Sequence, residues 1–177
     1  LQALPMEFAM EAQALNCQLQ YVHEQQRLDC RLSAWLKHRY AAGLVSYRPG
    51  RLRGQDLLAS WLWHLLLHAT GASSRSYLLG LKEAWQWPPM AATDAQACLS
   101  DWLMYMQQAA QQPLLLPVES AWQWISQCKD KKSGEISFDE DNLAKARRAA
   151  RLQFAGGPFT RAEDDDPYIQ AQLSDLE

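Results

Sequence analysis

A strand-like alternation followed by an apolar helix constrains the fold of this chain more than any other feature. Between residues 27 and 36 every second side chain is apolar, and this set consists of Leu28, Cys30, Leu32, Ala34 and Leu36. A period of two predicts a β-strand with one buried face. Ala42-Gly43 then marks a turn, and the run LVSY predicts a second strand, which Pro49-Gly50 ends because proline cannot donate to a ladder.

Residues 55–69 are apolar almost all round. A segment of this length is too short to span a membrane, so it predicts a helix that protein covers on several sides. Strand, turn, strand and buried helix make a nucleus over residues 27–71. They predict an α/β fold in which a small mixed sheet is flanked by helices.

The segments on either side of the nucleus carry weaker signals. Residues 7–20 have a helical composition, and they predict a helix that hands over to an edge strand at residues 20–23. The apolar runs 76–81 and 84–87 predict a hairpin that Pro88-Pro89 ends.

Further helices are predicted in the C-terminal half. One begins with a Thr93–Gln96 capping box, one covers residues 119–128, one runs from a Ser137–Glu140 capping box to Phe154, and a short one covers residues 167–173. Gly156-Gly157 ends the third of these helices. Residues 156–177 form a C-terminal acidic tail that holds the short helix, and its run EDDD is expected to be a solvated turn, with metal binding as the alternative.

Length and composition predict one domain over residues 1–177, because 177 residues of which 48% are hydrophobic can bury a sizeable core. The start at Leu1 leads us to expect a fragment of a longer chain. Four widely spaced cysteines without a CxxC pair, and the lack of a signal or transmembrane run, predict reduced thiols in a cytoplasmic protein. No metal or other cofactor is expected.

The strand pair and its helix resemble the core of the RecB-type nuclease superfamily. Active members read roughly G-R-I-D on the first strand and V-D-Y-K-T-G on the next, where the carboxylates hold Mg²⁺ and the lysine supports the reaction. In LDCRLSAWL and LVSYRPGRL the matching positions are Ser33, Ser46 and Arg48. Ser60 and His64 take the places of a Q-x-x-x-Y pattern on the helix. The resemblance therefore implies a restriction-endonuclease-like, PD-(D/E)xK-type core without catalytic residues.

More closely, the chain resembles the family of C-terminal domains of RecC, the gamma subunit of exodeoxyribonuclease V, also called RecBCD. The stretches RLSAWL, GLVSYRPGRL, WLWHLLLHATG, SYLLGLKEAWQWPPM, PLLLPVESAWQWI and EDDDPYIQ carry this likeness across about residues 28–170. It implies a non-catalytic domain of a helicase–nuclease complex in DNA repair and recombination. It also implies contacts with the RecD or RecB subunit, with DNA present in the complex and no membrane.

Two histidines and one aspartate invite a metal-site interpretation. His64 and His68 lie four residues apart, but neither an HExxH pattern nor an evident third ligand accompanies them, so packed or rim histidines are the preferred interpretation. Asp29 lies on the same strand face as Ser33. It is expected to be an exposed strand charge, with a displaced metal carboxylate as the alternative.

Basic and aromatic residues are the candidates for binding. Residues 27–53 carry seven Arg or Lys against one Asp, although the chain has a net charge of −3. Candidate DNA or partner contacts are Arg48, Arg51, Arg53, Arg31 and Lys37, with solvation as the alternative. Trp63, Trp87 and Trp124 are candidate exposed interface aromatics, since both members of an i, i+2 helical pair cannot face the same side.

Two other functions stay open at this point. An active Mg²⁺-dependent nuclease would need carboxylates that the motifs above do not supply. A general protein-interaction module unrelated to DNA would explain exposed tryptophans and an acidic tail.

Overall fold

The computed structural model describes residues 10–23, 25–111, 114–130, 135–157 and 162–174. These form two compact units: unit 1 comprises residues 1–52 and 56–111, and unit 2 comprises residues 53–55 and 112–177. The expectation that residues 1–177 fold as a single domain stays a prediction beside this division. No helix in the described ranges is both long enough and apolar enough to cross a membrane.

Unit 1 contains two sheets. The strands β1 (Gln13–His23) and β2 (Gln26–Leu36) form an antiparallel two-stranded sheet. A four-stranded sheet has the order β3 (Arg39–Tyr40), β4 (Gly43–Tyr47), β5 (Arg75–Leu79) and β6 (Ala84–Trp87). The strands β4 and β5 are parallel and the other neighbours are antiparallel, so the sheet is mixed. The helix α1 (Gly54–Ala69) connects the two parallel strands. The predicted α/β class with a small mixed sheet is confirmed.

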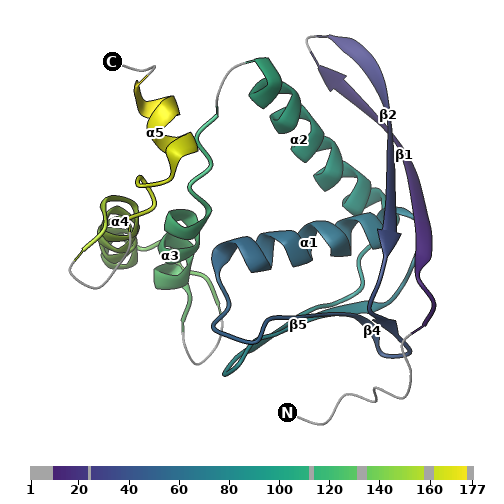
Figure 1. Cartoon of the computed structure of the whole chain (residues 1–177), viewed down its shortest axis with the longest axis horizontal. Helices are drawn as coiled ribbons and strands as arrows, with labels where there is room; N and C mark the ends of the chain where they lie inside the picture. The colour runs from purple at the N-terminus through teal and green to yellow at the C-terminus, as the bar shows by residue number, and fades with distance from the viewer. Residues whose placement is uncertain (1–9, 24, 112–113, 131–134, 158–161, 175–177) are drawn as a thin grey trace. The chain divides into compact units, whose positions relative to one another are not determined.

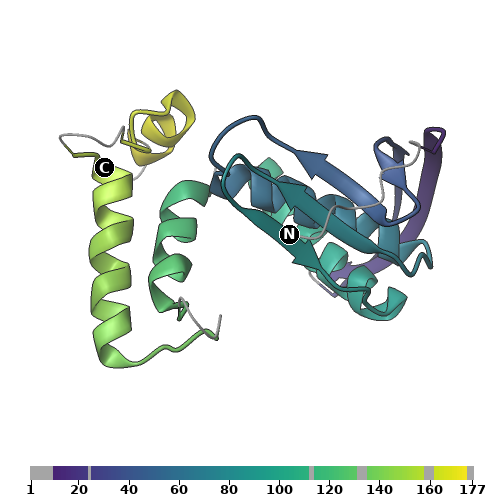
Figure 2. The same ribbon diagram turned by 90° about the horizontal axis from the view of Figure 1, so that it is seen from below.

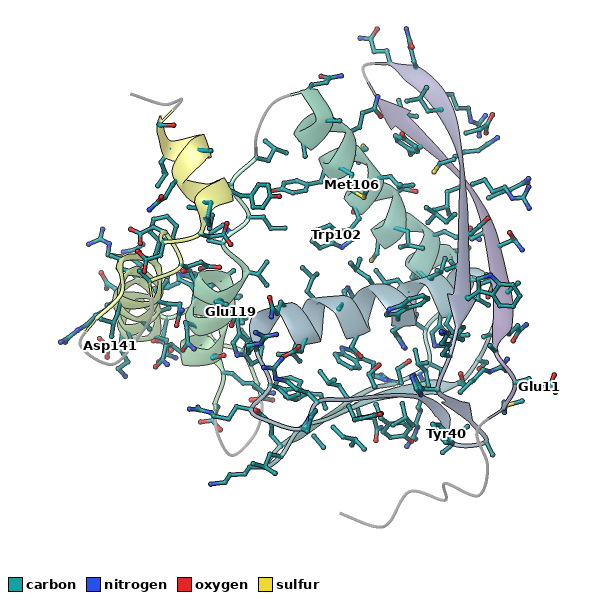
Figure 3. The ribbon with its side chains drawn as sticks, in the orientation of Figure 1. Glu11, Tyr40, Trp102, Met106, Glu119 and Asp141 are labelled. Carbon is teal, nitrogen blue, oxygen red and sulfur yellow. The ribbon has the colours of Figure 1, made fainter. Side chains whose placement is uncertain are left out.

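The helix α1 is the centre of unit 1. It lies along the four-stranded sheet, and α2 (Ala92–Gln111) lies on its other side (Figures 1 and 2). The main core cluster joins β1, α1 and α2 through Cys17, Leu19, Leu65, Ala69, Ala95 and Leu99. A second cluster consists of Leu15, Leu36, Leu44 and Leu67. On α2, the labelled Trp102 and Met106 lie on the side away from the strands β1 and β2 (Figure 3).

Gly43 lies against the backbone of the neighbouring strand in the mixed sheet. Its φ of +131° is a conformation that side-chain-bearing residues rarely adopt, and a Cβ there would collide with the Arg75 carbonyl oxygen of the neighbouring strand. Steric contact with the neighbouring strand therefore explains why a glycine stands at the turn predicted at Ala42-Gly43.

Unit 2 is helical in its described part. The helices α3 (Val118–Cys128) and α4 (Glu140–Ala155) lie side by side and antiparallel, and α5 (Pro167–Ser174) follows (Figure 2). In the connection between α3 and α4, Lys129 and Ile136 form an isolated antiparallel bridge. Gly156 ends α4 with a φ of +76°, as the Gly-Gly pair predicted.

Three local predictions were wrong. Residues 13–19 belong to β1 instead of a helix, because alternation at Leu15, Cys17 and Leu19 buries one face against the rest of unit 1 and pairing with β2 overrides helical composition. The strand predicted at residues 20–23 is present as the end of β1. Residues 7–9 lie outside the described residues. The residue Thr93 lies inside α2 and does not cap it, since the helix begins at Ala92. Asp139, not Ser137, caps α4: its Oδ1 accepts from the Asn142 amide at 2.8 Å.

The strand and helix assignments elsewhere were right. The strand β2 alternates between exposed and half-buried residues as predicted, and α1, α3 and α5 fall within a few residues of their predicted bounds. The hairpin of β5 and β6 is present. All four cysteines are free thiols.

Candidate functional site

Of the three positions that match nuclease motifs, Ser33 and Ser46 lie on two different sheets and Arg48 follows the strand of Ser46. Ser33 is on the exposed face of β2, where its hydroxyl donates to Asn16 Oδ1 at 2.9 Å and Arg31 donates to the same oxygen at 3.3 Å. Ser46 is half-buried on β4 beside Leu78 of β5. Both positions present a neutral hydroxyl in place of a carboxylate.

Arg48 follows β4 and is held in place by its neighbours. Its backbone amide donates to the Leu79 carbonyl at 2.9 Å, and its Nη1 lies 3.2 Å from Asp56 Oδ1 in the first turn of α1. The Asp56 side chain is only 19% exposed. The sequence reasoning missed this carboxylate, although an acid in the first turn of a helix is a recognisable signal. The ion pair neutralises the carboxylate beside the position where a nuclease would carry lysine.

The helix positions Ser60 and His64 lie inside the core. His64 is 1% exposed, and its Nδ1 lies 2.8 Å from Ser76 Oγ. Burial, followed by the nearby His68, lowers the pKa of His64 from 6.5 to about 4, so the ring is neutral at pH 7. His64 also stacks on Trp61, with ring centroids 5.3 Å apart.

His68 is buried as well, and both its ring nitrogens have backbone partners. Its Nε2 lies 2.8 Å from the Ser74 carbonyl oxygen and its Nδ1 lies 3.1 Å from that of Met90. A ring held between backbone groups in this way is a packed histidine. In the described ranges, no group of three or more His, Cys, Asp or Glu side chains is arranged to hold a metal ion.

The predicted contact residues are spread over the surface. Arg31 and Lys37 are exposed on and just after β2, Arg51 is exposed after β4, and Arg53, which belongs to unit 2, is also exposed. The structure joins Arg48 to Asp56 and Arg31 to Asn16. Their role in binding stays a prediction.

The three candidate aromatics differ in exposure. Trp63 is 37% exposed on α1. Trp87 is half-buried beside Trp61 and His64, and Trp124 is half-buried with its ring stacked on Phe138 at 5.8 Å. Trp35, which the sequence placed on the polar face of β2, is 65% exposed.

Two hollows lie beside these residues in unit 1. An apolar groove of about 340 Å³ is lined by Leu32, Ser33, Ala59, Leu62, Trp63, Leu66 and Leu99. A larger and more polar cleft of about 820 Å³ lies between the antiparallel pair β1–β2 and the N-terminal half of α2. Its lining includes Asp29, Arg31 and Gln96. Asp29 is exposed there, as expected of a strand charge.

In unit 2 two glutamates hold the beginnings of helices. Glu119, labelled at the start of α3 in Figure 3, accepts from the backbone amides of Gly54 and Gln55 at 3.0 and 3.1 Å. Glu163 accepts from the amides of Glu119 and Ser120 at 2.9 and 2.8 Å, and also from the Ser120 hydroxyl. The first residue of the EDDD run is therefore a helix cap, not a solvated charge or a metal ligand.

Comparisons with known proteins identify the family to which this sequence is similar. The family model described as the RecC C-terminal domain matches residues 2–129. The chain is 30% identical over 140 residues to the RecBCD enzyme subunit RecC of Escherichia coli (strain K12), covering 78% of this chain. RecBCD enzyme subunits RecC from two Buchnera aphidicola subspecies, Acyrthosiphon pisum and Schizaphis graminum, are 24% and 27% identical, each covering 76% of this chain. The matches span 12 to 13% of the length of these relatives.

Proposed function

Because the chain belongs to the RecC C-terminal domain family, we propose that it is a non-catalytic domain of a RecBCD-type helicase–nuclease. In this proposal it acts in the repair and recombination of broken DNA through contacts with the other subunits, in the cytoplasm. Its core is a restriction-endonuclease-like frame that has lost its catalytic groups. The parallel pair of β4 and β5 with α1 between them supports such a frame.

The ion pair between Arg48 and Asp56 is the observation that carries the non-catalytic proposal. Mg²⁺ sheds its water reluctantly and needs anionic oxygens. Ser33 and Ser46 offer none, and the Asp56 carboxylate already faces a guanidinium at 3.2 Å. The buried, neutral His64 adds no charge to the same helix.

The apolar groove beside Trp63 is the surface we propose for subunit contact, with the RecD subunit as its occupant. The groove offers an aromatic side chain at its rim, and exposed Arg31 and Lys37 lie on and after the strand that lines it. A partner segment that inserts an apolar side chain and presents acidic flanks would complement both features.

Capture of separately purified RecD and RecB on the immobilised chain tests the proposal. We expect RecD to be retained, and Trp63→Ser to lower its affinity about tenfold or more, as for an aromatic interface anchor. Trp35→Ser is the matched control, since it removes an exposed tryptophan outside the groove. Failure to retain either subunit contradicts the scaffold role, whereas cleavage of linear DNA by the chain with Mg²⁺ contradicts the non-catalytic one.

A further inference from the structure

The exposed face of α4 carries four cations that the sequence reasoning did not single out. Lys145, Arg147, Arg148 and Arg151 are all exposed, whereas Ala146 on the opposite face is fully buried. At about 100° per residue the four basic side chains fall within less than half of the helix circumference. Acidic residues dominate the remainder of the C-terminal third, so the net charge of this region does not reveal the basic face.

The helix itself offers its arginines no acidic partner. The positions three and four residues from Arg147, Arg148 and Arg151 hold only Leu, Ala, Lys, Arg and Phe. In the described part of the chain, none of these three guanidinium groups is assigned a hydrogen bond or an ion pair. Like charges at this spacing destabilise an isolated helix. Three arginines that oppose helix formation and pair with no acid of their own helix fit a surface that meets an external anion.

We propose that this face of α4 binds the phosphate backbone of nucleic acid. Three of the four cations are arginines, whose planar donors match phosphate oxygens. The cations extend over about 9 Å of helix axis, which corresponds to about three phosphates along a single strand and about five charges along a duplex. Leu152, 52% exposed on the same face, offers an apolar contact to a sugar or base. The choice of nucleic acid as the anion rests on the proposed function.

A charge-matched pair of variants of the full chain tests this assignment. R147Q/R148Q/R151Q removes the arginine face, and R27Q/R75Q/K82Q removes three exposed cations of unit 1 that belong to no proposed contact. The probes are a fluorescein-labelled single-stranded oligonucleotide and its duplex, with anisotropy read from about 50 to 200 mM salt. Poly-glutamate serves as an acidic-protein probe.

We expect the α4 variant to lose about tenfold or more in affinity, and the control to lose less than about twofold. The slope of log affinity against log salt should fall in magnitude by about 2 on the single strand and about 3 on the duplex, as three lost phosphate contacts predict. The arm with the larger loss identifies the preferred form. Equal losses in both variants, or an unchanged slope, would overturn the assignment. Lost poly-glutamate binding with unchanged oligonucleotide binding would overturn it in favour of an acidic protein partner.

Stability provides the second measurement. Removing like-charge neighbours should leave the urea midpoint unchanged or slightly raised. Should the triple variant unfold earlier, the single variants R147Q, R148Q and R151Q replace it, each with an expected slope change of about 0.7 on the single strand. Subunit capture uses no nucleic acid, so failure of this assignment and failure of the scaffold proposal are distinguishable.

Discussion

Unit 1 buries histidines and a serine hydroxyl in a layered core, whereas unit 2 keeps carboxylates at the beginnings of helices. In unit 1, α1 places His64 and His68 against Ser76 of β5 and two backbone carbonyls. In unit 2, Glu163 and Glu119 each satisfy a pair of backbone amides at a helix start. We therefore expect the free energy of unfolding to depend on core packing and on an uncharged His64 in unit 1, and on the capping carboxylates in unit 2.

The largest expected effect is in the core of unit 1. Leu65 is 0% exposed, so Leu65→Ala should lower the free energy of unfolding by about 2–5 kcal/mol through lost burial and a residual cavity. Urea unfolding followed by fluorescence measures it. Leu81→Ala, at a position 71% exposed, is the control and should change stability by less than about 0.5 kcal/mol. A comparable loss in both variants would contradict the layered core.

Acid should weaken unit 1 through His64. The unfolded pKa is 6.5 and the folded pKa is about 4, so the unfolded state binds the proton first as pH falls. The part of the unfolding free energy that depends on neutral His64 is fully present above pH 6.5 and is lost as pH falls toward 4. Its upper limit is about 3 kcal/mol. Unfolding at pH 7 and pH 5 should show this loss, and His64→Asn should flatten it. An equally steep pH dependence in the variant would assign the effect to other groups.

Removing the Glu163 carboxylate should have the next largest effect, now in unit 2. Glu163→Ala leaves the Glu119 and Ser120 amides without their acceptor, and it should lower the free energy of unfolding by about 1–2 kcal/mol. Thermal unfolding with Asp165→Ala as control measures it, because Asp165 is an exposed neighbour in the same acidic run. If the two substitutions behave alike, the run is a solvated turn as the sequence first indicated.

The smallest effect is expected at the start of α4. The Asn142 amide, then the Ser137 hydroxyl, lower the pKa of Asp139 from 3.8, so its stabilisation is present above that value and is lost as pH falls through the lowered pKa. Asp139→Ala should reduce helix content slightly in circular dichroism at pH 7. The control Ser137→Ala keeps the cap itself and should change less. No difference between them would mean that the cap does not stabilise α4.

Local periodicity predicted most of unit 1, whereas strand pairing in unit 1 and long-range polar contacts in unit 2 explain what it missed. The strand β2 and the helix α1 could be predicted because each shows its own repeat within a short window. The first part of β1 could not, since its glutamine-containing residues take their conformation from pairing with β2. The contact between Glu163 and Ser120 joins positions 43 residues apart, and no local pattern announces it.

The candidate site was predictable only in part. The substitutions at Ser33, Ser46 and Arg48 are visible in the sequence, but the Asp56 partner of Arg48 depends on how β4 leads into α1. Exposure of Trp63 could be expected from its helical pair. The half-buried position of Trp87 follows from ring contacts with His64 and Trp61, and that of Trp124 from stacking on Phe138. These ring partners belong to other elements of the fold, so the spacing of residues within one element cannot reveal them.

Gly43 has a consequence for how this domain can change over time. Its missing side chain lets one strand lie against the Arg75 carbonyl of the next, and the same strand leads, a few residues later, into the arginine paired with Asp56. Any larger residue would push the two backbones apart and shift everything downstream in register. A position without charge, ligand or chemistry is therefore expected to tolerate substitution poorly, and mutational surveys should find it intolerant even where the surrounding surface varies freely.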